Sequence, residues 1–511
     1  MEKRKVLGTI IGVLAFIALI AGISFAWFSW QSSNNTLVSF TVGGVDITFD
    51  AGADITSSKL RPVSTKEVGV SKGYAVKKTI TASSPLTAYL NLYLTLETLP
   101  DGLKHESFIW ELYKGSDLVG KGNFKNNNQG DKVRIASSQK ITNTTSTYDL
   151  YIWIDGNNYD NPETMQNQTF KFVLSADATD EEPNYGLITL TNLGLSVSDG
   201  TPNFMKTAKE SCSDTSTCET TNGIYEAEDD LGTTYYFRGA VENNYVKFAG
   251  FYWRIIRING DGTIRMIYDG TTAHSNGESS PDRQLQNVAF NTNYNDNAYV
   301  GYMYGTPGSS TYEATHANIN NSTIKTANDA WYKTNIQDKG YGDYVADAIY
   351  CGDRQVVSFP EMGLTGNGIG TQNTAYGFFG RFSLSEEGMP TNFTPSLKCA
   401  QENDRFTTTT SLGNGDLTYP VGLLTVDEVN MAGAIVIDTN YSYYLYTGDY
   451  YWLFSPYAFD SDYASVWGVR DVGSLNADDV DFSSGLRPVI SLKSNIGFSG
   501  NGTMNNPFEI S

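Results

Sequence analysis

The chain has 511 residues, enough for about three domains of ordinary size. Its 35 Lys and Arg against 56 Asp and Glu leave a formal charge of −21, and a field of this sign repels phosphate backbones, which argues against nucleic-acid binding. Only 18% of the residues are charged, whereas 13% are aromatic. This composition is typical of extracellular β proteins with many short strands and few helices.

Residues 1–30 have the pattern of a targeting segment. Three basic residues precede an uncharged apolar run over residues 6–28, and about 20 such residues cross a bilayer as a helix. Two outcomes stay open: a retained membrane anchor with a cytoplasmic N-terminus, or a signal peptide cleaved after Ala26. In both cases the rest of the chain is expected at the extracellular face of the membrane or secreted.

An exported chain with an even number of cysteines permits disulfides. The four cysteines are Cys212, Cys218, Cys351 and Cys399. We expect Cys212 to pair with Cys218, which would close a tight loop, and Cys351 to pair with Cys399. A zinc site is the alternative, but the spacing is not that of a CxxC pair and no His lies close in sequence.

Apolar and polar residues alternate with a period of two from residue 37 to residue 176. In residues 88–97, Ala and Leu occupy one face, while Tyr, Asn, Thr and Glu occupy the other. The same pattern recurs at residues 45–49, 108–112, 148–154 and 170–174. Such strands, separated by Gly, Asn, Asp and Ser, predict an all-β, two-sheet antiparallel sandwich over residues 31–178.

The N-terminal residues resemble a known class of exported proteins. The order of basic residues, apolar run, Ala26-Trp27-Phe28-Ser29 and a strand-like segment at 38–50 is similar to TasA/camelysin-type fibre subunits and surface proteases. The resemblance implies a jelly-roll-like sandwich and, for TasA-like subunits, assembly by insertion of an N-terminal strand into a neighbour. Proteolysis of the camelysin kind is not supported, because His105-Glu106 lacks the second His of an HExxH motif.

A change in composition marks residues 179–233, which we predict to be a linker that carries the first cysteine pair. Residues 234–511 then change to an α+β pattern. The turn Asn259-Gly260-Asp261-Gly262 between two apolar runs predicts a β-hairpin. A helix is predicted to follow Ser322, and another to begin at Thr425, where Thr425-Val426-Asp427-Glu428 is a capping-box pattern.

Four segments of this second half occur in an order that resembles a bacterial surface domain of uncharacterised function. They are Phe-Tyr-Trp-Arg-Ile-Ile-Arg at 251–257, Gly-Leu-Leu-Thr-Val-Asp-Glu at 422–428, Tyr-Trp-Leu-Phe-Ser-Pro at 451–456 and Gly-Leu-Arg-Pro-Val-Ile-Ser-Leu at 485–492. That domain is similar to the C-type-lectin-like fold of formylglycine-generating enzymes. The resemblance implies short helices, a twisted sheet and long loops on one side. It does not imply their chemistry, because no thiol follows Cys399.

The sequence does not favour catalysis. The three histidines lie in no recognisable nucleophile context, and we expect His105, His274 and His316 to be surface residues. Arg487 is expected to be structural, tying a loop to the terminal strand. An enzyme that acts on peptidoglycan or sugar through Asp/Glu pairs is the third hypothesis for the function.

A loop-borne binding surface is the main prediction for a site. Tyr offers a large rigid face and a hydroxyl for contacts with protein or sugar, and half of the tyrosines are expected to pack under the loops. The candidates are Tyr444, Tyr446, Tyr450, Trp452, Tyr457, Asp460, Asp462, Tyr463, Asp478, Asp479 and Asp481. No motif requires a cofactor; Ca²⁺ is an alternative for the acidic residues, although solvated surface carboxylates are the simpler interpretation.

These features predict a non-catalytic, Gram-positive-type cell-surface adhesin or ligand-binding protein. Its partner would be a glycan, or a surface or matrix protein, and residues 6–28 would contact the membrane. The alternative is a structural fibre or biofilm matrix subunit that self-assembles by strand addition.

Overall fold

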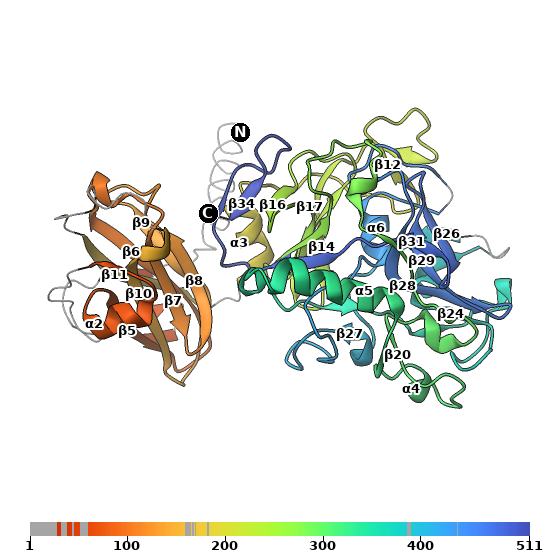
Figure 1. Cartoon of the computed structure of the whole chain (residues 1–511), viewed down its shortest axis with the longest axis horizontal. Helices are drawn as coiled ribbons and strands as arrows, with labels where there is room; N and C mark the ends of the chain where they lie inside the picture. The colour runs from red at the N-terminus through yellow and green to blue at the C-terminus, as the bar shows by residue number, and fades with distance from the viewer. Residues whose placement is uncertain are drawn as a thin grey trace, which may run out of the picture. The chain divides into compact units, whose positions relative to one another are not determined.

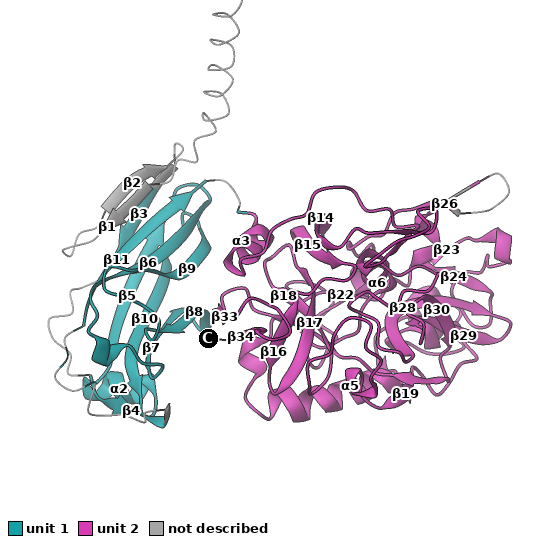
Figure 2. Cartoon of the chain, turned by 90° about the horizontal axis from the view of Figure 1, so that it is seen from above, with its two compact units in different colours: residues 1–183 teal, residues 184–511 magenta. Residues whose placement is uncertain are grey.

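The computed structural model describes residues 28–31, 38–42, 45–51, 60–158, 165, 168, 170–180, 183–385, 390–436 and 438–510. The chain is mainly β-strand in several sheets with few helices (Figure 1), as the composition predicts. It divides into two compact units, residues 1–183 and 184–511 (Figure 2). Residues 6–27 of the apolar run 6–28, predicted to be a helix, lie outside the described residues, and Phe28 begins strand β1. No described helix is both long enough and apolar enough to span a bilayer.

Two sheets build the first unit. The first has the order β1 (Phe28–Gln31), β11 (Lys171–Thr179), β6 (Ala88–Thr98), β9 (Lys132–Ile141). The second has the order β2 (Val38–Val42), β3 (Val45–Asp50), β5 (Val76–Ser83), β10 (Ser146–Asp155), β7 (Phe108–Lys114), β8 (Asp117–Asn123). The short strand β4 (Pro62–Val63) pairs with β10 in parallel and precedes helix α2 (Lys66–Lys72).

Strand β6 shows how the period-two pattern becomes a core. Leu90, Leu92 and Leu94 are fully buried, as the alternation predicts. Tyr89, Asn91 and Tyr93 of the opposite face are buried as well, contrary to a half-exposed strand, whereas Thr95 is half-buried and Glu97 is exposed. β6 lies between β11 and β9 in the sheet, and polar side chains of both neighbours contact this face. The Lys132 ammonium of β9 lies 3.9 Å from the centroid of the Tyr93 ring. Asn91 donates to Asp177 of β11 at 2.7 Å on that face.

The second unit contains two larger sheets. One sheet has the path β14 (Gly223–Asp229), β15 (Gly232–Arg238), β17 (Phe251–Ile258), β16 (Tyr245–Phe248), β34 (Phe508–Ile510), β33 (Phe498–Ser499). In addition, β18 (Ile264–Tyr268) pairs with β17, and β32 (Val489–Leu492) pairs with β18. The other sheet has the path β19 (Asn287–Ala289), β31 (Ser483–Gly485), β28 (Tyr451–Asp460), β24 (Thr374–Tyr376), β23 (Val356–Val357). In addition, β29 (Tyr463–Val469) pairs with β28, and β30 (Leu475–Asp479) pairs with β29.

Shorter elements complete the second unit. Four two-stranded sheets pair β12 (Thr207–Ala208) with β13 (Cys218–Glu219), β20 (Met303–Tyr304) with β21 (Asn320–Asn321), β22 (Tyr350–Cys351) with β27 (Arg405–Phe406), and β25 (Phe382–Leu384) with β26 (Pro390–Phe393). The described α-helices are α3 (Tyr185–Asn192), α4 (Tyr312–Thr315), α5 (Thr323–Tyr332) and α6 (Val426–Ala432).

The segment 179–233 differs from the predicted linker. It contains α3, β12, β13 and β14, and the division between the units falls after Pro183. Leu190 of α3 and Ile224 of β14 are buried in the core of the second unit. The polar composition of this stretch comes from the turns between its short elements, so a few apolar anchors are enough to fix it to the unit.

The local predictions in the second unit agree with the structure. Strands β17 and β18 form the antiparallel hairpin around Asn259–Thr263. The hydroxyl of Ser322 accepts the Lys325 amide at the start of α5. At α6, Thr425 and Glu428 form both bonds of the capping box. Two disulfides have the expected pairing, Cys212 with Cys218 and Cys351 with Cys399.

Candidate binding surface

The structure separates the predicted binding residues into core and surface. Tyr444, Tyr446 and Trp452 are buried, at 0%, 8% and 1% exposure. Tyr450, Tyr457 and Asp478 are half-buried, whereas Asp460, Asp462, Tyr463, Asp479 and Asp481 are exposed. The prediction of one continuous surface across all of these residues is therefore corrected, because Trp452 of β28 and the tyrosines at 444 and 446 pack into the core.

The buried aromatic residues have internal hydrogen-bond partners. The Tyr444 hydroxyl donates to the carbonyl of Phe237, and the Trp452 indole donates to the carbonyl of Val288 at 2.8 Å. Burial raises the pKa of Tyr450, and a nearby carboxylate, Asp478, raises it further, to about 12. A satisfied polar tip on a buried ring is the ordinary state of a core aromatic residue, so these side chains stabilise the fold.

Three segments of the chain meet at the turn end of the β28–β29 hairpin. The Ala464 amide donates to the carbonyl of Tyr294 at 2.7 Å, and the Val480 amide donates to the carbonyl of Ala464 at 3.0 Å. The Asn291 amide donates to the carbonyl of Val480 at 2.9 Å. These backbone bonds hold segments 291–294, 460–464 and 479–482 side by side.

An exposed pair of stacked tyrosines lies where these segments meet. The rings of Tyr294 and Tyr463 have centroids 4.8 Å apart and an angle of 11° between their planes. They are 36% and 41% exposed, and Phe482 in the third segment is 58% exposed. We call Tyr294, Tyr463, Phe482 and the carboxylates Asp460, Asp462, Asp479 and Asp481 the tyrosine surface. Large aromatic side chains gathered at a surface are unusual and mark binding sites.

The turn that presents Tyr463 has an unfavourable backbone. Ser461 and Asp462 connect β28 to β29 with φ of 50° and 75°. Positive φ at both central positions is a type I′ turn, for which Asn-Gly is the preferred sequence. A residue with a Cβ in this conformation costs about 1 kcal/mol relative to Gly. The sequence keeps a serine and a carboxylate there instead.

The carboxylates of the tyrosine surface have only weak local partners. Asp460 accepts from the Ser461 hydroxyl, and Asp479 accepts from the Ser465 hydroxyl at 3.0 Å. None of the four forms an ion pair with a described residue. Across the described part of the chain, no three or more His, Cys, Asp or Glu side chains gather as a metal-ligand group. The surface can therefore stack with a ligand and accept hydrogen bonds from it.

Sequence reasoning missed Tyr294 and Phe482. A usable signal was present for Tyr294, because Asn291–Asn297 reads Asn-Thr-Asn-Tyr-Asn-Asp-Asn and contains no aliphatic residue. A single aromatic residue in such a segment has no neighbouring apolar side chains with which to form a core. Phe482 follows three acidic residues in the stretch 478–481, which gives a weaker signal of the same kind.

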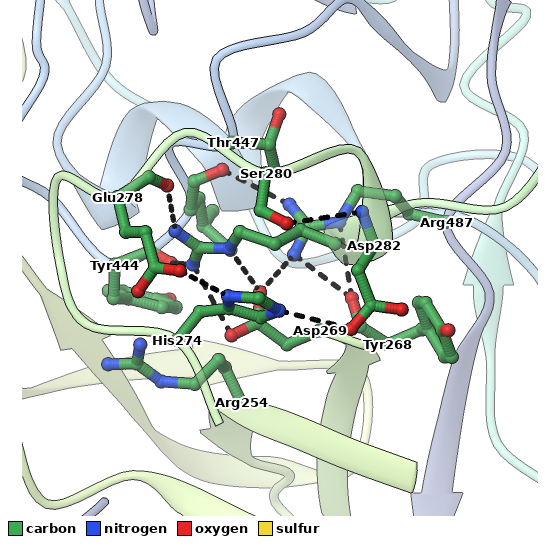
Figure 3. Close-up of polar contacts among 12 residues, drawn as sticks. Arg254, Tyr268, Asp269, His274, Glu278, Ser280, Asp282, Tyr444, Thr447 and Arg487 are labelled. Atoms are coloured by element: carbon green, nitrogen blue, oxygen red, sulfur yellow. Dashed lines mark hydrogen bonds and ion pairs between the residues drawn. The ribbon is translucent and has the colours of Figure 1, made fainter. Parts of the chain in front are cut away.

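Elsewhere in the unit, a buried polar network centres on Asp269 (Figure 3). The fully buried Asp269 carboxylate accepts from Arg283 at 2.9 Å and from Arg487 at 3.0 Å. Arg487 also donates to the carbonyls of Tyr268 and Leu445, so it joins three segments, in agreement with a structural role. Asp269, Arg283 and Arg487 find their hydrogen-bond partners within the protein, so the network stabilises the fold.

Two histidines correct the expectation that all three lie at the surface. The buried ring of His274 lies between Glu278, at 2.8 Å from Nδ1, and Asp282, at 3.1 Å from Nε2 (Figure 3). His316 is fully buried and contacts the carbonyl of Gly368 through Nε2. Burial lowers the pKa of His316 to about 3. Only His105 is partly exposed.

A small cavity lies beside Glu428 at the start of α6. It has a volume of about 30 Å³, room for about two water molecules. Glu428 is held by Arg257 at 3.0 Å and by Arg265 at 2.6 Å, and Arg257 also contacts Asp229 at 2.6 Å. The space is too small for a sugar ring, and its charges are paired, so the network serves the fold.

Comparisons with known proteins give no family to which the chain can be assigned. No protein-family model matches the sequence, and no curated protein matches it. The tyrosine surface presents exposed aromatic rings and carboxylates that suit contacts with a ligand.

Proposed function

We propose that the protein is an exported bacterial cell-surface adhesin that binds a glycan through the tyrosine surface and does not catalyse a reaction. The observation that carries the proposal is the exposed, stacked pair of Tyr294 and Tyr463. The proposal extends to the finer architecture: a jelly-roll-like sandwich in the first unit for display, and a C-type-lectin-like arrangement in the second for binding.

The chemistry of the tyrosine surface suits a sugar. A tyrosine face packs against the apolar face of a sugar ring, and its hydroxyl remains available for hydrogen bonds. Two stacked rings lose little conformational entropy on binding because each already restrains the other. Neighbouring carboxylates accept hydrogen bonds from sugar hydroxyls. A partner protein would instead be expected to need a larger apolar area than these three aromatic side chains offer.

The proposed location outside the membrane has support from the cysteines. Both disulfides lie in the second unit, and no described cysteine is free. Disulfides persist in oxidising compartments and are rare in the cytosol. Together with the basic and apolar N-terminal sequence, they favour a chain that is anchored to, or secreted from, the outer face of the membrane.

The test is a binding screen of the full chain, purified in detergent, against bacterial and host glycans and matrix proteins. We expect reproducible binding to one class of glycan, weaker binding in Tyr463→Ala, and no change in Tyr441→Ala. Tyr441 is a matched control, because it is 51% exposed and lies outside the tyrosine surface. Parallel arms with Ca²⁺ and with chelator test the acidic turns for a role of calcium. Binding to no glycan by the folded protein contradicts the proposal.

A second candidate function is a fibre or matrix subunit that assembles by strand addition. The observation that favours it is β1, a four-residue strand at the edge of its sheet that pairs with β11 from Phe28 to Gln31. A short edge strand is replaceable by the same segment of another copy. Polymers that form in a concentration-dependent manner and lose that tendency when residues 28–31 are replaced by a Gly/Ser sequence would support it.

A further inference from the structure

We infer that the glycan recognised by the tyrosine surface carries free, protonated amino groups. This inference rests on the proposed function and narrows its ligand class. It starts from the four exposed carboxylates Asp460, Asp462, Asp479 and Asp481, which form no ion pair with described residues. The three segments that build the surface contain no Lys or Arg.

Asp460 and Asp479 lie on the same side of the sheet as the ring of Tyr463. Tyr463 and Ser465 alternate with the buried Ala464, so their side chains share the outer face of β29. Asp479 is in register with Ser465 and accepts its hydroxyl on that face. Tyr463 and Asp479 are diagonal neighbours across the β29–β30 pair, and such neighbours lie about 7–8 Å apart, within the Debye length of about 8 Å at physiological ionic strength. A cation stacked on Tyr463 is therefore within the field of Asp479.

The charge distribution of the second unit also favours a cationic ligand. It holds 18 of the 35 basic residues and 37 of the 56 acidic residues of the chain, for a net charge of −19. Seven of its ten arginines are buried, where they hold internal carboxylates and carbonyls such as Asp269. These arginines contribute little positive charge to the surface, so an anionic ligand meets repulsion and a cationic one meets attraction.

The faces of the tyrosine rings also favour a free amine over an acetylated one. The negative face of a tyrosine ring attracts an ammonium group within about 6 Å. Acetylation of an amino sugar removes the charge and replaces it with a neutral amide. Free amines in such a glycan would therefore gain from both the rings and the carboxylates, whereas their acetylated forms would keep only the stacking.

The test compares three oligosaccharides of equal length with the full chain in detergent: β-1,4-linked glucosamine, its fully N-acetylated form, and β-1,4-linked glucose. At a pH at which the amines are protonated, we expect the glucosamine oligomer to bind about tenfold more tightly than the acetylated one, from several exposed charge pairs. The combined Asp460→Asn, Asp462→Asn, Asp479→Asn and Asp481→Asn variant is expected to lose this difference and to keep its binding of the acetylated form. Added salt is expected to reduce the difference in the unmodified chain.

The control is Asp471→Asn, which removes an exposed carboxylate at the other end of β29 and is expected to change neither affinity. Equal or tighter binding of the acetylated oligomer overturns the inference and leaves the glycan-binding proposal in place. Binding of a lysine polymer without binding of any sugar overturns both, and so does the absence of binding to every oligosaccharide in the wider screen. Circular dichroism of each variant verifies that it is folded.

Discussion

Tyr294 and Tyr463 stack with their ring centroids 4.8 Å apart, although neither ring belongs to the hydrophobic core and both remain more than a third exposed. Backbone hydrogen bonds to Ala464 fix the two segments in place, so the pair exists without a ligand. A preformed platform of this kind reduces the entropy lost on binding.

Single substitutions of these tyrosines are expected to be non-additive. Tyr294→Ala and Tyr463→Ala should each weaken glycan binding about three- to tenfold, because each removes one ring and the support it gives to the other. The double variant should lose less binding free energy than the two single variants lose together, because the effects of substitutions at contacting residues are coupled. Calorimetric titration of the four proteins gives the coupling. Full additivity would show that the rings act independently.

The strained turn predicts a gain in stability at the expense of the surface. Replacing Ser461 and Asp462 by Asn and Gly should stabilise the second unit by about 1 kcal/mol, because Asn-Gly suits a type I′ turn. Asp462→Asn alone should change stability by less than about 0.5 kcal/mol, since Asn also tolerates positive φ. Urea unfolding measures the free energy of unfolding of both variants. A destabilised Asn-Gly variant would contradict the turn assignment.

Arg487 is expected to be among the most sensitive positions of the second unit. Arg487→Leu leaves Asp269 with one cation fewer and removes the donors to the carbonyls of Tyr268 and Leu445. Loss of one partner from a buried ion pair costs about 3–5 kcal/mol. The exposed Arg470→Leu is the matched control and should cost less than about 0.5 kcal/mol. Equal effects in thermal unfolding would argue against the network.

The raised pKa of Asp427 predicts that the stability of the protein depends on pH in a specific way. Its carboxylate is buried, and burial together with the neighbouring Asp353 raises its pKa to about 6, despite the ion pair with Arg381. Since this pKa lies above the ordinary value of 3.8, the folded state takes up the proton first. The stabilising contribution of the protonated group is complete below about pH 4 and is lost as the pH rises to about 6.

The variant Asp427→Asn does not titrate at this position and isolates the effect. Relative to it, the natural chain should gain about 2 kcal/mol of stability between pH 7 and pH 4. Asp471→Asn removes an exposed carboxylate and is the control. Its free energy of unfolding should change with pH as that of the natural chain does over the same range. A constant difference between the natural chain and Asp427→Asn would show that Asp427 is ionised throughout.

The two disulfides are expected to differ in their effect. Cys351 and Cys399 are 48 residues apart, and Cys212 and Cys218 are 6 apart. In the chain-entropy account, closure of the longer loop is worth about 4 kcal/mol and closure of the shorter one about 2 kcal/mol. Replacement of each pair by serine, followed by urea unfolding, should give a larger loss for Cys351 and Cys399. The reverse order would point to strain or contacts rather than loop closure.

Local sequence patterns predicted much of the β-rich fold. Alternation in residues 88–97 identified β6, and the Asn-Gly-Asp-Gly turn identified the β17–β18 hairpin, because both depend on neighbours in sequence. Burial of the polar face of β6 depends on β9 and β11, which are distant in sequence. The place of residues 184–233 in the second unit also depends on distant contacts, so a polar composition alone suggested a linker there.

Local sequence patterns identified only part of the candidate site. Aromatic residues at 444–463 are equally compatible with a core strand and a binding loop, and the structure places Trp452 in the former and Tyr463 at the end of the hairpin. The partner ring, Tyr294, comes from a remote segment that no local pattern connects to β29. Pairing across the fold, rather than composition, creates the tyrosine surface.

The most direct measurement is a titration of the full chain, and of its Tyr294→Ala/Tyr463→Ala variant, with the glycan that binds best in the screen. We predict that the variant keeps its unfolding midpoint, because both rings are largely outside the core, and that its affinity falls at least about tenfold. Tyr441→Ala should bind as the natural chain does. Unchanged affinity in the folded double variant would contradict the tyrosine surface as the site of binding.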